Sequence, residues 1–270
     1  MRRARGPMIG FIGAGTMGQA LIQGLVRQGR APSRLMAADP NPAIRARVAR
    51  LGVRATAENP AVVRGSRVVV LAVKPQQLPG VSDEIAPHVT TRHLLISIAA
   101  GITLRWLESR HPGVPVVRVM PNLPATVGSG FAAIVGGRLA TARHRALARE
   151  LFEAVGRCRE VPERYLDAVT AVSGSGPAYV FFLVDAWQRA AQALGLPEAI
   201  AGEAIRATLT GSARLLEASA ESAEALMRRV ASKRGTTEAA LQVLARRRVQ
   251  AAFGQAIEAA ARRSRALSWP

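Results

Sequence analysis

A glycine-rich stretch near the start of the sequence has the residue types and spacing of a phosphate-binding loop. Gly13-Ala14-Gly15-Thr16-Met17-Gly18 follows an apolar run, Met8 to Ile12, and opens a helical pattern. In a G-x-G-x-x-G turn the first glycine makes the tight turn, the second admits a pyrophosphate and the third lets helix and strand pack closely. The helix N-terminus then binds the phosphates. We therefore predict a dinucleotide site formed by Gly13, Gly15, Thr16, Met17 and Gly18.

A carboxylate ends the second predicted strand. Asp39 follows Leu35 to Ala38, where a carboxylate commonly accepts a hydrogen bond from the adenosine ribose and favours NAD. Asn41 and Arg45 lie just beyond it and could instead bind a 2′-phosphate, so NADH and NADPH both stay open as cofactors. The alternative for Asp39 is a turn-forming role in the Asp39-Pro40 pair.

Further polar or small residues follow later strands. Lys74 comes after the β-branched run Val68 to Val73 and is one of only two lysines. Because ligands lie outside the carboxyl ends of such strands, we predict that Lys74 reaches the cofactor; a solvated loop lysine is the alternative. Ser97 to Gly101 and Met120 to Pro124 also follow strands, and we expect the nicotinamide ring beside Ala99, Ala100 and Asn122.

No nucleophile, metal or paired-carboxylate set is visible. The four histidines, His88, His93, His111 and His144, join no nucleophile motif, and neither histidine spacing nor the single cysteine suits a metal. We predict no metal site. Hydride transfer to an already protonated imine needs little proton chemistry from the protein, because positioning does most of the work.

The pattern of elements indicates two domains. Residues 1–163 alternate short apolar runs with helical patterns, which predicts an α/β Rossmann-type domain with a parallel, doubly wound sheet. Residues 164–270 show no good strand, which predicts an all-α domain. The predicted strands are 8–12, 35–38, 68–73, 94–98, 116–119 and 131–135, and the predicted helices 16–28, 163–172, 177–194, 197–219, 223–230, 236–245 and 249–267.

Composition restricts partners and compartment. The net charge is +19 with 37 basic residues, yet aromatic residues make up only 4%, so we expect no specific nucleic-acid partner. We expect no membrane span, because we find no apolar run near about 20 residues, and we expect a cytoplasmic protein. The small apolar positions of the second domain predict packing against a second copy, as a homodimer or an oligomer of dimers.

At these motifs the chain resembles the pyrroline-5-carboxylate reductase family. The most specific match is Thr170 to Tyr179, with Ser173-Gly174-Ser175-Gly176 before Pro177-Ala178-Tyr179. The likeness runs from Met8 to about Leu267. The other matching pieces are Gly13 to Gly18, Ala72-Val73-Lys74-Pro75, Ser97 to Gly101, Met120 to Pro124 and Gly235-Thr236-Thr237.

The resemblance implies an activity and the roles of further residues. It implies NAD(P)H-dependent reduction of 1-pyrroline-5-carboxylate, a cyclic imino acid, to L-proline, and dimerisation through the helical domain. It also implies that Asn59, Ala72 and Lys74 lie at the cofactor. The turn Ser232 to Thr237 would hold the substrate carboxylate through Ser232, Gly235, Thr236 and Thr237, with Thr237 as the catalytic hydrogen-bond partner of the ring nitrogen.

The chain departs from the family pattern at two places. The turn reads Ser232-Lys233-Arg234-Gly235, where the family usually has proline and glycine in place of the two cations. Arg234 is strained if its backbone needs a positive φ. Leu123 stands where the family usually has threonine. Two alternatives therefore stay open: a reductase of a different cyclic imino acid, and a divergent NAD(P)-binding relative with little activity.

Overall fold

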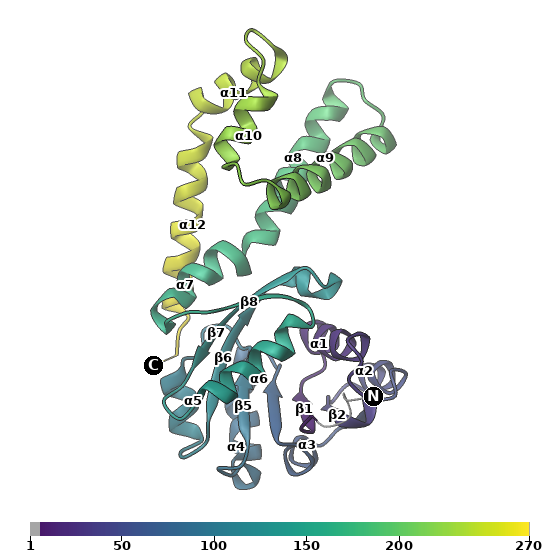
Figure 1. The fold of residues 1–270 in the computed structure, drawn as a ribbon, viewed down its shortest axis with the longest axis vertical. Coiled ribbons are helices and arrows are strands. Elements are labelled where there is room, and N and C mark those ends of the chain that lie inside the picture. Colours follow the sequence, from purple (N-terminus) through teal and green to yellow (C-terminus); the bar gives the residue numbers. More distant parts are fainter. Residues whose placement is uncertain (1–5, 270) are drawn as a thin grey trace. The chain divides into compact units, whose positions relative to one another are not determined.

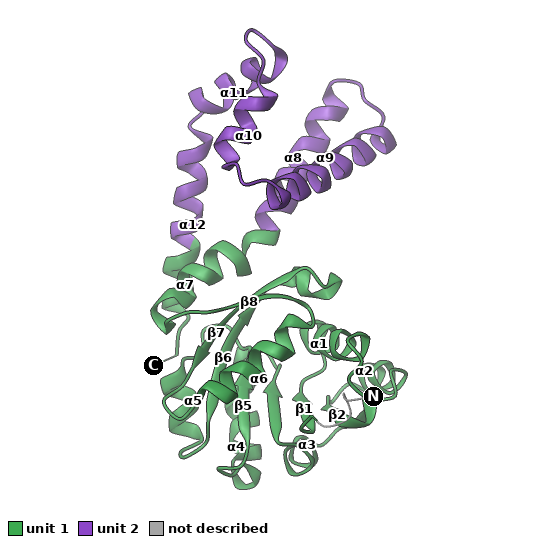
Figure 2. Cartoon of the chain, in the orientation of Figure 1, with its two compact units in different colours: residues 1–177, 260–270 green, residues 178–259 purple. Residues whose placement is uncertain are grey.

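The structure is a computed structural model that describes residues 6–269. It divides into two compact units, residues 1–177 with 260–270, and residues 178–259 (Figure 2). The first unit is therefore discontinuous in the sequence. Residues 164–177 and 260–269, which the sequence analysis assigned to the helical domain, pack within the first unit.

The first unit is built on one eight-stranded sheet with the order β3-β2-β1-β4-β5-β6-β7-β8 (Figure 1). All neighbouring strands run parallel except β6 and β7, which are antiparallel. The strands are β1 (Ile9–Ile12), β2 (Leu35–Ala38), β3 (Arg54–Thr56), β4 (Val68–Leu71), β5 (Leu94–Ser97), β6 (Val116–Pro121), β7 (Gly130–Gly136) and β8 (Gly156–Glu160).

Helices cover both faces of this sheet, which explains why its strands are apolar without alternation. Within β4, Val68 and Val70 join the core cluster under one face, and Val69 and Leu71 join the cluster under the other. Helices α1 and α6 pack on the first face and α3, α4 and α5 on the second. Their bounds are α1 (Thr16–Arg27), α2 (Pro42–Ala49), α3 (Asn59–Gly65), α4 (Leu78–Ile85), α5 (Leu104–Arg110) and α6 (Ala142–Glu153).

The Rossmann-type α/β class is confirmed, with three differences in detail. Two strands were not predicted: β3 is short with an exposed residue, and β8 carries two arginines and a glutamate, so neither has an apolar run to announce it. The sheet is not wholly parallel, because β7 returns from β6 after a short connection. Such a return suits antiparallel pairing, since a parallel one needs a long crossover.

The segment around Ser173 is helical rather than a break between helices. After a 3₁₀ turn, α7 (Leu166–Val169) continues into a π-helical turn, Thr170–Gly174, and then into α8 (Gly176–Ala193). The run of small residues still allows a close approach: a Cβ on Gly174 would lie 2.7 Å from the Met120 Cε atom.

The second unit is all helical, as predicted. It contains most of α8, then α9 (Glu198–Ala218), α10 (Ala223–Val230), α11 (Thr236–Arg246) and the first part of α12 (Val249–Ala266). Tyr179 on α8 meets Phe253 on α12 edge to face, with ring centroids 5.6 Å apart. Helix α8 exposes a row of large apolar side chains: Val180, Phe181, Phe182, Leu183 and Trp187.

One helical run is longer and more apolar than the sequence analysis predicts for any segment. The helical run Glu163–Ala193 has 31 residues and a mean hydropathy of 1.2 in its most apolar window, and only 6% of that window is buried within the chain. Length and composition alone would allow it to cross a membrane. A helix whose apolar side packs against another subunit has the same properties.

Candidate cofactor site and substrate turn

The predicted cofactor residues of the first unit gather along one edge of the sheet. The glycine loop follows β1, Asp39 follows β2, Asn59 follows β3 and Lys74 follows β4. Ala99 and Asn122 follow β5 and β6, the next strands in the sheet order. Because these strands are parallel, their carboxyl ends lie at the same edge, which is where α/β sheets bind ligands.

The three motif glycines have three different surroundings. Gly13 has φ +88°, and a Cβ there would lie 2.7 Å from the Ala72 carbonyl oxygen. A Cβ on Gly18 would lie 2.6 Å from the Gly13 carbonyl oxygen, so this glycine permits close packing. Among the described residues, and apart from its two chain neighbours and nearby helix backbone, Gly15 has no atom within 4 Å of the position a Cβ would take. A Cβ at Gly15 would therefore project only into the open space before the helix.

The helix end beside this space has the features that a phosphate requires. Gly15 caps α1 without a side-chain hydrogen bond, and the first turn of α1 has no acidic residue, so no carboxylate of the helix itself competes for its positive end. Gln19, which the sequence analysis did not single out, donates from Nε2 to the Ala14 carbonyl at 2.7 Å and fixes the loop. No clear pattern in the sequence marks Gln19.

Asp39 supports the loop with both of its carboxylate oxygens. Oδ2 accepts the Ala14 N–H at 2.9 Å and Oδ1 accepts the Asn41 N–H at 2.9 Å, and the residue is 7% exposed. The turn-forming alternative for Asp39 is therefore present in the structure. Arg45 lies at the same turn, where its Nη1 donates to the Asp39 carbonyl at 2.9 Å and the Pro40 carbonyl at 2.7 Å.

The remaining predicted cofactor residues differ in exposure and in the hydrogen bonds that their side chains make within the chain. Lys74 is exposed. Asn59 donates from its amide to Glu84 Oε2 at 2.7 Å. Ala99 is buried while Ala100 is exposed, so Ala100 offers the accessible surface of the loop after β5.

Asn122 joins three parts of the first unit. Its Oδ1 accepts the Phe131 N–H at 2.8 Å, which fixes the start of β7. Its Nδ2 donates to Ser173 Oγ at 3.0 Å and to the Ser173 carbonyl at 3.3 Å, which fixes the π-helical turn. Leu123 beside it is exposed and adds no hydrogen bond from its side chain.

The predicted substrate turn lies in the second unit, between α10 and α11. Gly235 caps α11 without a side-chain bond, and its N–H donates to the Ser232 carbonyl at 3.0 Å. Ser232 and Thr236 are exposed, while Thr237 in the first turn of α11 is half-buried. The turn therefore presents a helix N-terminus flanked by hydroxyl groups, an arrangement that suits a carboxylate.

Arg234 has the positive φ at which a non-glycine residue is strained. Its φ is 58°, in the left-handed region that glycine prefers. Its N–H donates to the carboxylate of Glu238. Glu238 therefore already supplies a carboxylate to this turn from within the chain.

Comparisons with known proteins agree with this arrangement. Residues 163–267 match the family model of the pyrroline-5-carboxylate reductase dimerisation domain, and residues 8–101 match the model described as NADP oxidoreductase, coenzyme F420-dependent. The chain is 40% identical to the pyrroline-5-carboxylate reductase of Methanosarcina acetivorans, over 96% of this chain and 97% of that protein. The chain belongs to the pyrroline-5-carboxylate reductase family.

Solved structures of the family have the same fold. A pyrroline-5-carboxylate reductase from Coxiella burnetii superimposes with a TM-score of 0.93 at 32% identity, covering 98% of this chain and 100% of that chain. The Plasmodium falciparum pyrroline carboxylate reductase, solved with NADP bound, superimposes with a TM-score of 0.88 at 26% identity, again covering 98% and 100%. The chain is therefore an oxidoreductase with the fold class that the sequence predicts.

Proposed function

We propose that this protein reduces 1-pyrroline-5-carboxylate to L-proline with NADPH. The observation that carries the proposal is the open cradle at Gly15, on a chain 40% identical over 96% of its length to a pyrroline-5-carboxylate reductase. When bound, the nicotinamide supplies a hydride to the imine carbon, and the ring nitrogen ends with one proton. The tasks of the chain are to bind both molecules and to orient them.

The proposed roles follow the edge of the sheet and the turn before α11. Gly13 to Gly18 hold the pyrophosphate, Lys74 and Asn59 border the cofactor, and Ala99, Ala100 and Asn122 border the nicotinamide. Ser232, Gly235 and Thr236 hold the substrate carboxylate. Thr237 hydrogen-bonds the ring nitrogen.

The surroundings of Asp39 favour NADPH over NADH. A carboxylate displayed to the ribose would repel a 2′-phosphate, but that of Asp39 is buried and accepts two N–H groups of its own loop. The Arg45 guanidinium at the same turn is a suitable partner for a phosphate, because Arg binds phosphate through several N–H donors at once.

A steady-state assay tests the proposal. Oxidation of NADPH should depend on 1-pyrroline-5-carboxylate, and Thr237→Ala should lower kcat while the affinity for NADPH stays unchanged. Thr237→Ser, which keeps the hydroxyl, is the matched control. Binding of NADPH without oxidation in the presence of the imine would reject the activity, and unchanged turnover in Thr237→Ala would remove Thr237 from the mechanism.

A second substrate class is favoured by Lys233 and Arg234. Two cations at a turn that binds a carboxylate would suit a cyclic imine that carries a second acidic group. Comparing kcat/KM for 1-pyrroline-5-carboxylate, its six-membered homologue and a dicarboxylic imine separates the two substrate classes. The dicarboxylic imine is the better substrate only if Lys233 and Arg234 bind its second acidic group.

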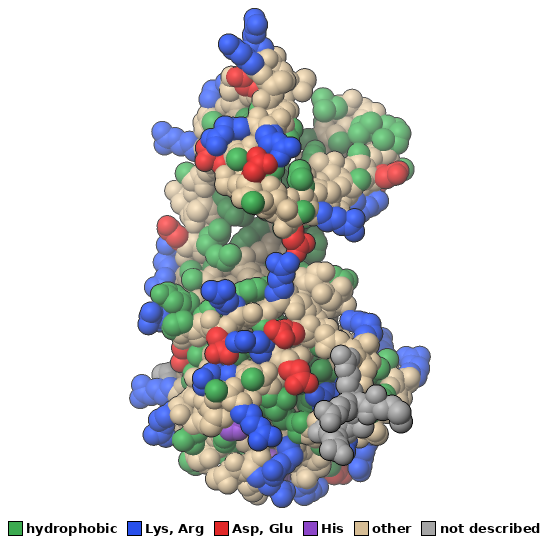
Figure 3. All heavy atoms as spheres, viewed as in Figure 1, with side chains coloured by type: hydrophobic (Ala, Val, Ile, Leu, Met, Phe, Trp, Pro, Cys, Tyr) green, Lys and Arg blue, Asp and Glu red, His purple; other side chains and the backbone are tan. Residues whose placement is uncertain are grey.

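We also propose that the protein is a cytoplasmic homodimer, or an oligomer of such dimers. The match to the dimerisation family covers residues 163–267, which include the apolar run Glu163–Ala193. A partner subunit that covers Phe181, Phe182 and Leu183 would remove them from water, so no membrane is needed. In the view of Figure 3, basic side chains are scattered over this face rather than gathered in one stripe. Light scattering in the absence of detergent would show the dimer mass.

A further inference from the structure

A short segment after α12 pairs with the loop that follows β5. The Trp269 N–H donates to the Gly101 carbonyl at 2.8 Å, and Trp269 forms a single parallel bridge with Ile102. The Thr103 hydroxyl donates to the Trp269 carbonyl at 2.9 Å. Both main-chain groups of Trp269 are therefore used to hold this loop.

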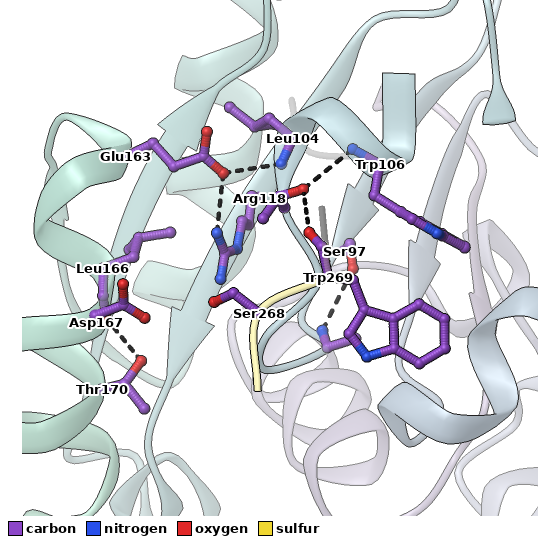
Figure 4. Close-up of polar contacts among 12 residues, drawn as sticks. Ser97, Leu104, Trp106, Arg118, Glu163, Leu166, Asp167, Thr170, Ser268 and Trp269 are labelled. Atoms are coloured by element: carbon purple, nitrogen blue, oxygen red, sulfur yellow. Dashed lines mark hydrogen bonds and ion pairs between the residues drawn. The ribbon is translucent and has the colours of Figure 1, made fainter. Parts of the chain in front are cut away.

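The indole ring adds a second attachment. Trp269 meets Trp106 of α5 edge to face, with ring centroids 5.9 Å apart and an interplanar angle of 90° (Figure 4). Such aromatic pairs stabilise beyond the apolar area that they bury. The Thr103 hydroxyl also accepts the main-chain N–H of Trp106 at 3.1 Å. The Thr103 side chain therefore links the start of α5 to the segment after α12.

The loop has a glycine where the segment approaches most closely. Gly101 has φ +76°, and a Cβ there would lie 2.7 Å from the Leu267 carbonyl oxygen. Both its backbone conformation and its contact with Leu267 therefore require glycine.

A carboxylate also fixes the start of α5. Glu163 Oε1 accepts the Leu104 N–H at 2.8 Å and the Arg118 Nη1 at 2.9 Å (Figure 4), and the Arg118 side chain is buried. The start of α5 is thus held by Glu163 and by Trp269. Between these attachments and β5 lies Ala100, which is exposed.

We infer that Trp269 is a positioning residue for hydride transfer. It holds the loop Ile98 to Thr103 in the conformation in which Ala99 and Ala100 border the nicotinamide. This inference rests on the proposed function, which places the nicotinamide there. The glycine loop after β1 anchors the other end of the cofactor, so loosening Trp269 should disturb orientation more than affinity.

The test compares three variants at one position. Trp269→Phe keeps the main-chain N–H and an aromatic ring, Trp269→Ala removes the ring, and Trp269→Pro removes the N–H as well. Since a misplacement of about 1 Å can cost up to about a hundredfold in rate, we expect kcat to fall on the order of tenfold in Trp269→Ala and further in Trp269→Pro. The dissociation constant for NADPH should change less than about twofold, and Trp269→Phe should restore most of kcat.

A core variant separates positioning from general destabilisation. Phe152→Leu on α6 lies in the other hydrophobic cluster of the first unit, and it should lower the melting temperature without lowering kcat. Equal kcat in the wild type, Trp269→Ala and Trp269→Pro would overturn the inference, as would a loss of kcat in Phe152→Leu that matches theirs at equal melting temperature.

Failure of the proposed function gives a different result. If the wild type binds NADPH but does not oxidise it whichever cyclic imine is added, the activity is rejected. The fluorescence of bound NADPH then decides the inference on Trp269. A changed emission in Trp269→Pro with unchanged affinity supports a role in positioning the nicotinamide, and an unchanged emission overturns it.

Discussion

The Asn122 amide donates to the Ser173 hydroxyl at 3.0 Å. This bond joins the carboxyl end of β6 to the π-helical turn Thr170–Gly174, two segments far apart in the sequence. π-Helical turns occur often at functional sites. The Ser-Gly run is thereby tied directly to the strand end at which we place the nicotinamide.

Removing this hydroxyl should weaken the attachment without abolishing it. Ser173→Ala leaves Asn122 with the Ser173 carbonyl at 3.3 Å, so we expect the free energy of unfolding to fall by about 1 kcal/mol. Asn122→Leu also leaves the Phe131 N–H without its partner and should cost more, together with a larger loss of kcat than of NADPH affinity. Urea unfolding and steady-state kinetics measure both effects. Equal stability of the two variants would contradict this role of Asn122.

The same substitution at two glycines of one motif should affect two different properties, cofactor affinity at Gly15 and stability at Gly18. Gly15→Ala adds a methyl group into open space, so the protein should fold normally while the KM for NADPH rises on the order of tenfold, or about 1.4 kcal/mol. Gly18→Ala forces a methyl group against the Gly13 carbonyl and should destabilise the fold by about 1–3 kcal/mol. Thermal unfolding and NADPH titration distinguish the two. A Gly15→Ala protein with normal NADPH affinity would place the pyrophosphate elsewhere.

Arg45 should determine the preference between the two cofactors. A hydrogen bond to a charged group contributes about 1.5–3 kcal/mol, so Arg45→Ala should raise the KM for NADPH about tenfold or more and leave that for NADH nearly unchanged. Arg47 on the same helix is exposed and serves as the control. Parallel losses with both cofactors would instead indicate that Arg45 acts only by holding the Asp39 turn.

His111 should make the protein less stable in mild acid. Burial, followed by the nearby Arg110 charge, lowers the pKa of His111 from 6.5 to about 4, although Asp83 opposes the shift. His111 is therefore protonated below about pH 6.5 in the unfolded chain but only below about pH 4 in the folded chain. Stability should fall as the pH drops through this window, by about 3 kcal/mol from this group. In His111→Gln the slope of unfolding free energy against pH should be smaller there; an unchanged slope would exclude His111 as its source.

Arg234 and Arg248 offer a matched pair for testing the substrate turn. Their φ angles are 58° and 52°, and both should be relieved by glycine. The left-handed conformation costs a non-glycine residue about 1–2 kcal/mol. Glycine removes this strain, but its greater backbone freedom in the unfolded chain offsets about 0.5–1 kcal/mol of the gain. Each variant should thus gain up to about 1 kcal/mol of unfolding free energy.

Only Arg234→Gly should also change the KM for the imine, because Arg248 lies between α11 and α12. A similar change of KM in Arg248→Gly would show that the effect does not come from the turn.

The sequence predicts those parts of the fold whose signal is local. The apolar strands and the glycine motif were found because a buried strand and a phosphate turn each have a short characteristic pattern. β8 was missed because it is polar, and the helical continuity through Ser173 was missed because four small residues resemble a break.

The contacts around the candidate site depend on partners distant in the sequence. Asp39 holding Ala14, and Trp269 holding Gly101, require the folded chain to bring residues together. No local pattern announces them. The predicted site residues therefore came from motifs, while the roles of the residues that support them came from the structure.

The path of the chain through its two units affects the order in which the protein can be made. The sheet and its helices are complete once residue 177 has been synthesised, but the segment that closes the loop after β5 belongs to residues 260–269. Domains generally fold as units during synthesis from the N-terminus. In the nascent α/β unit the loop around Gly101 therefore lacks its contacts with Leu267 and Trp269 until the whole helical unit has been synthesised.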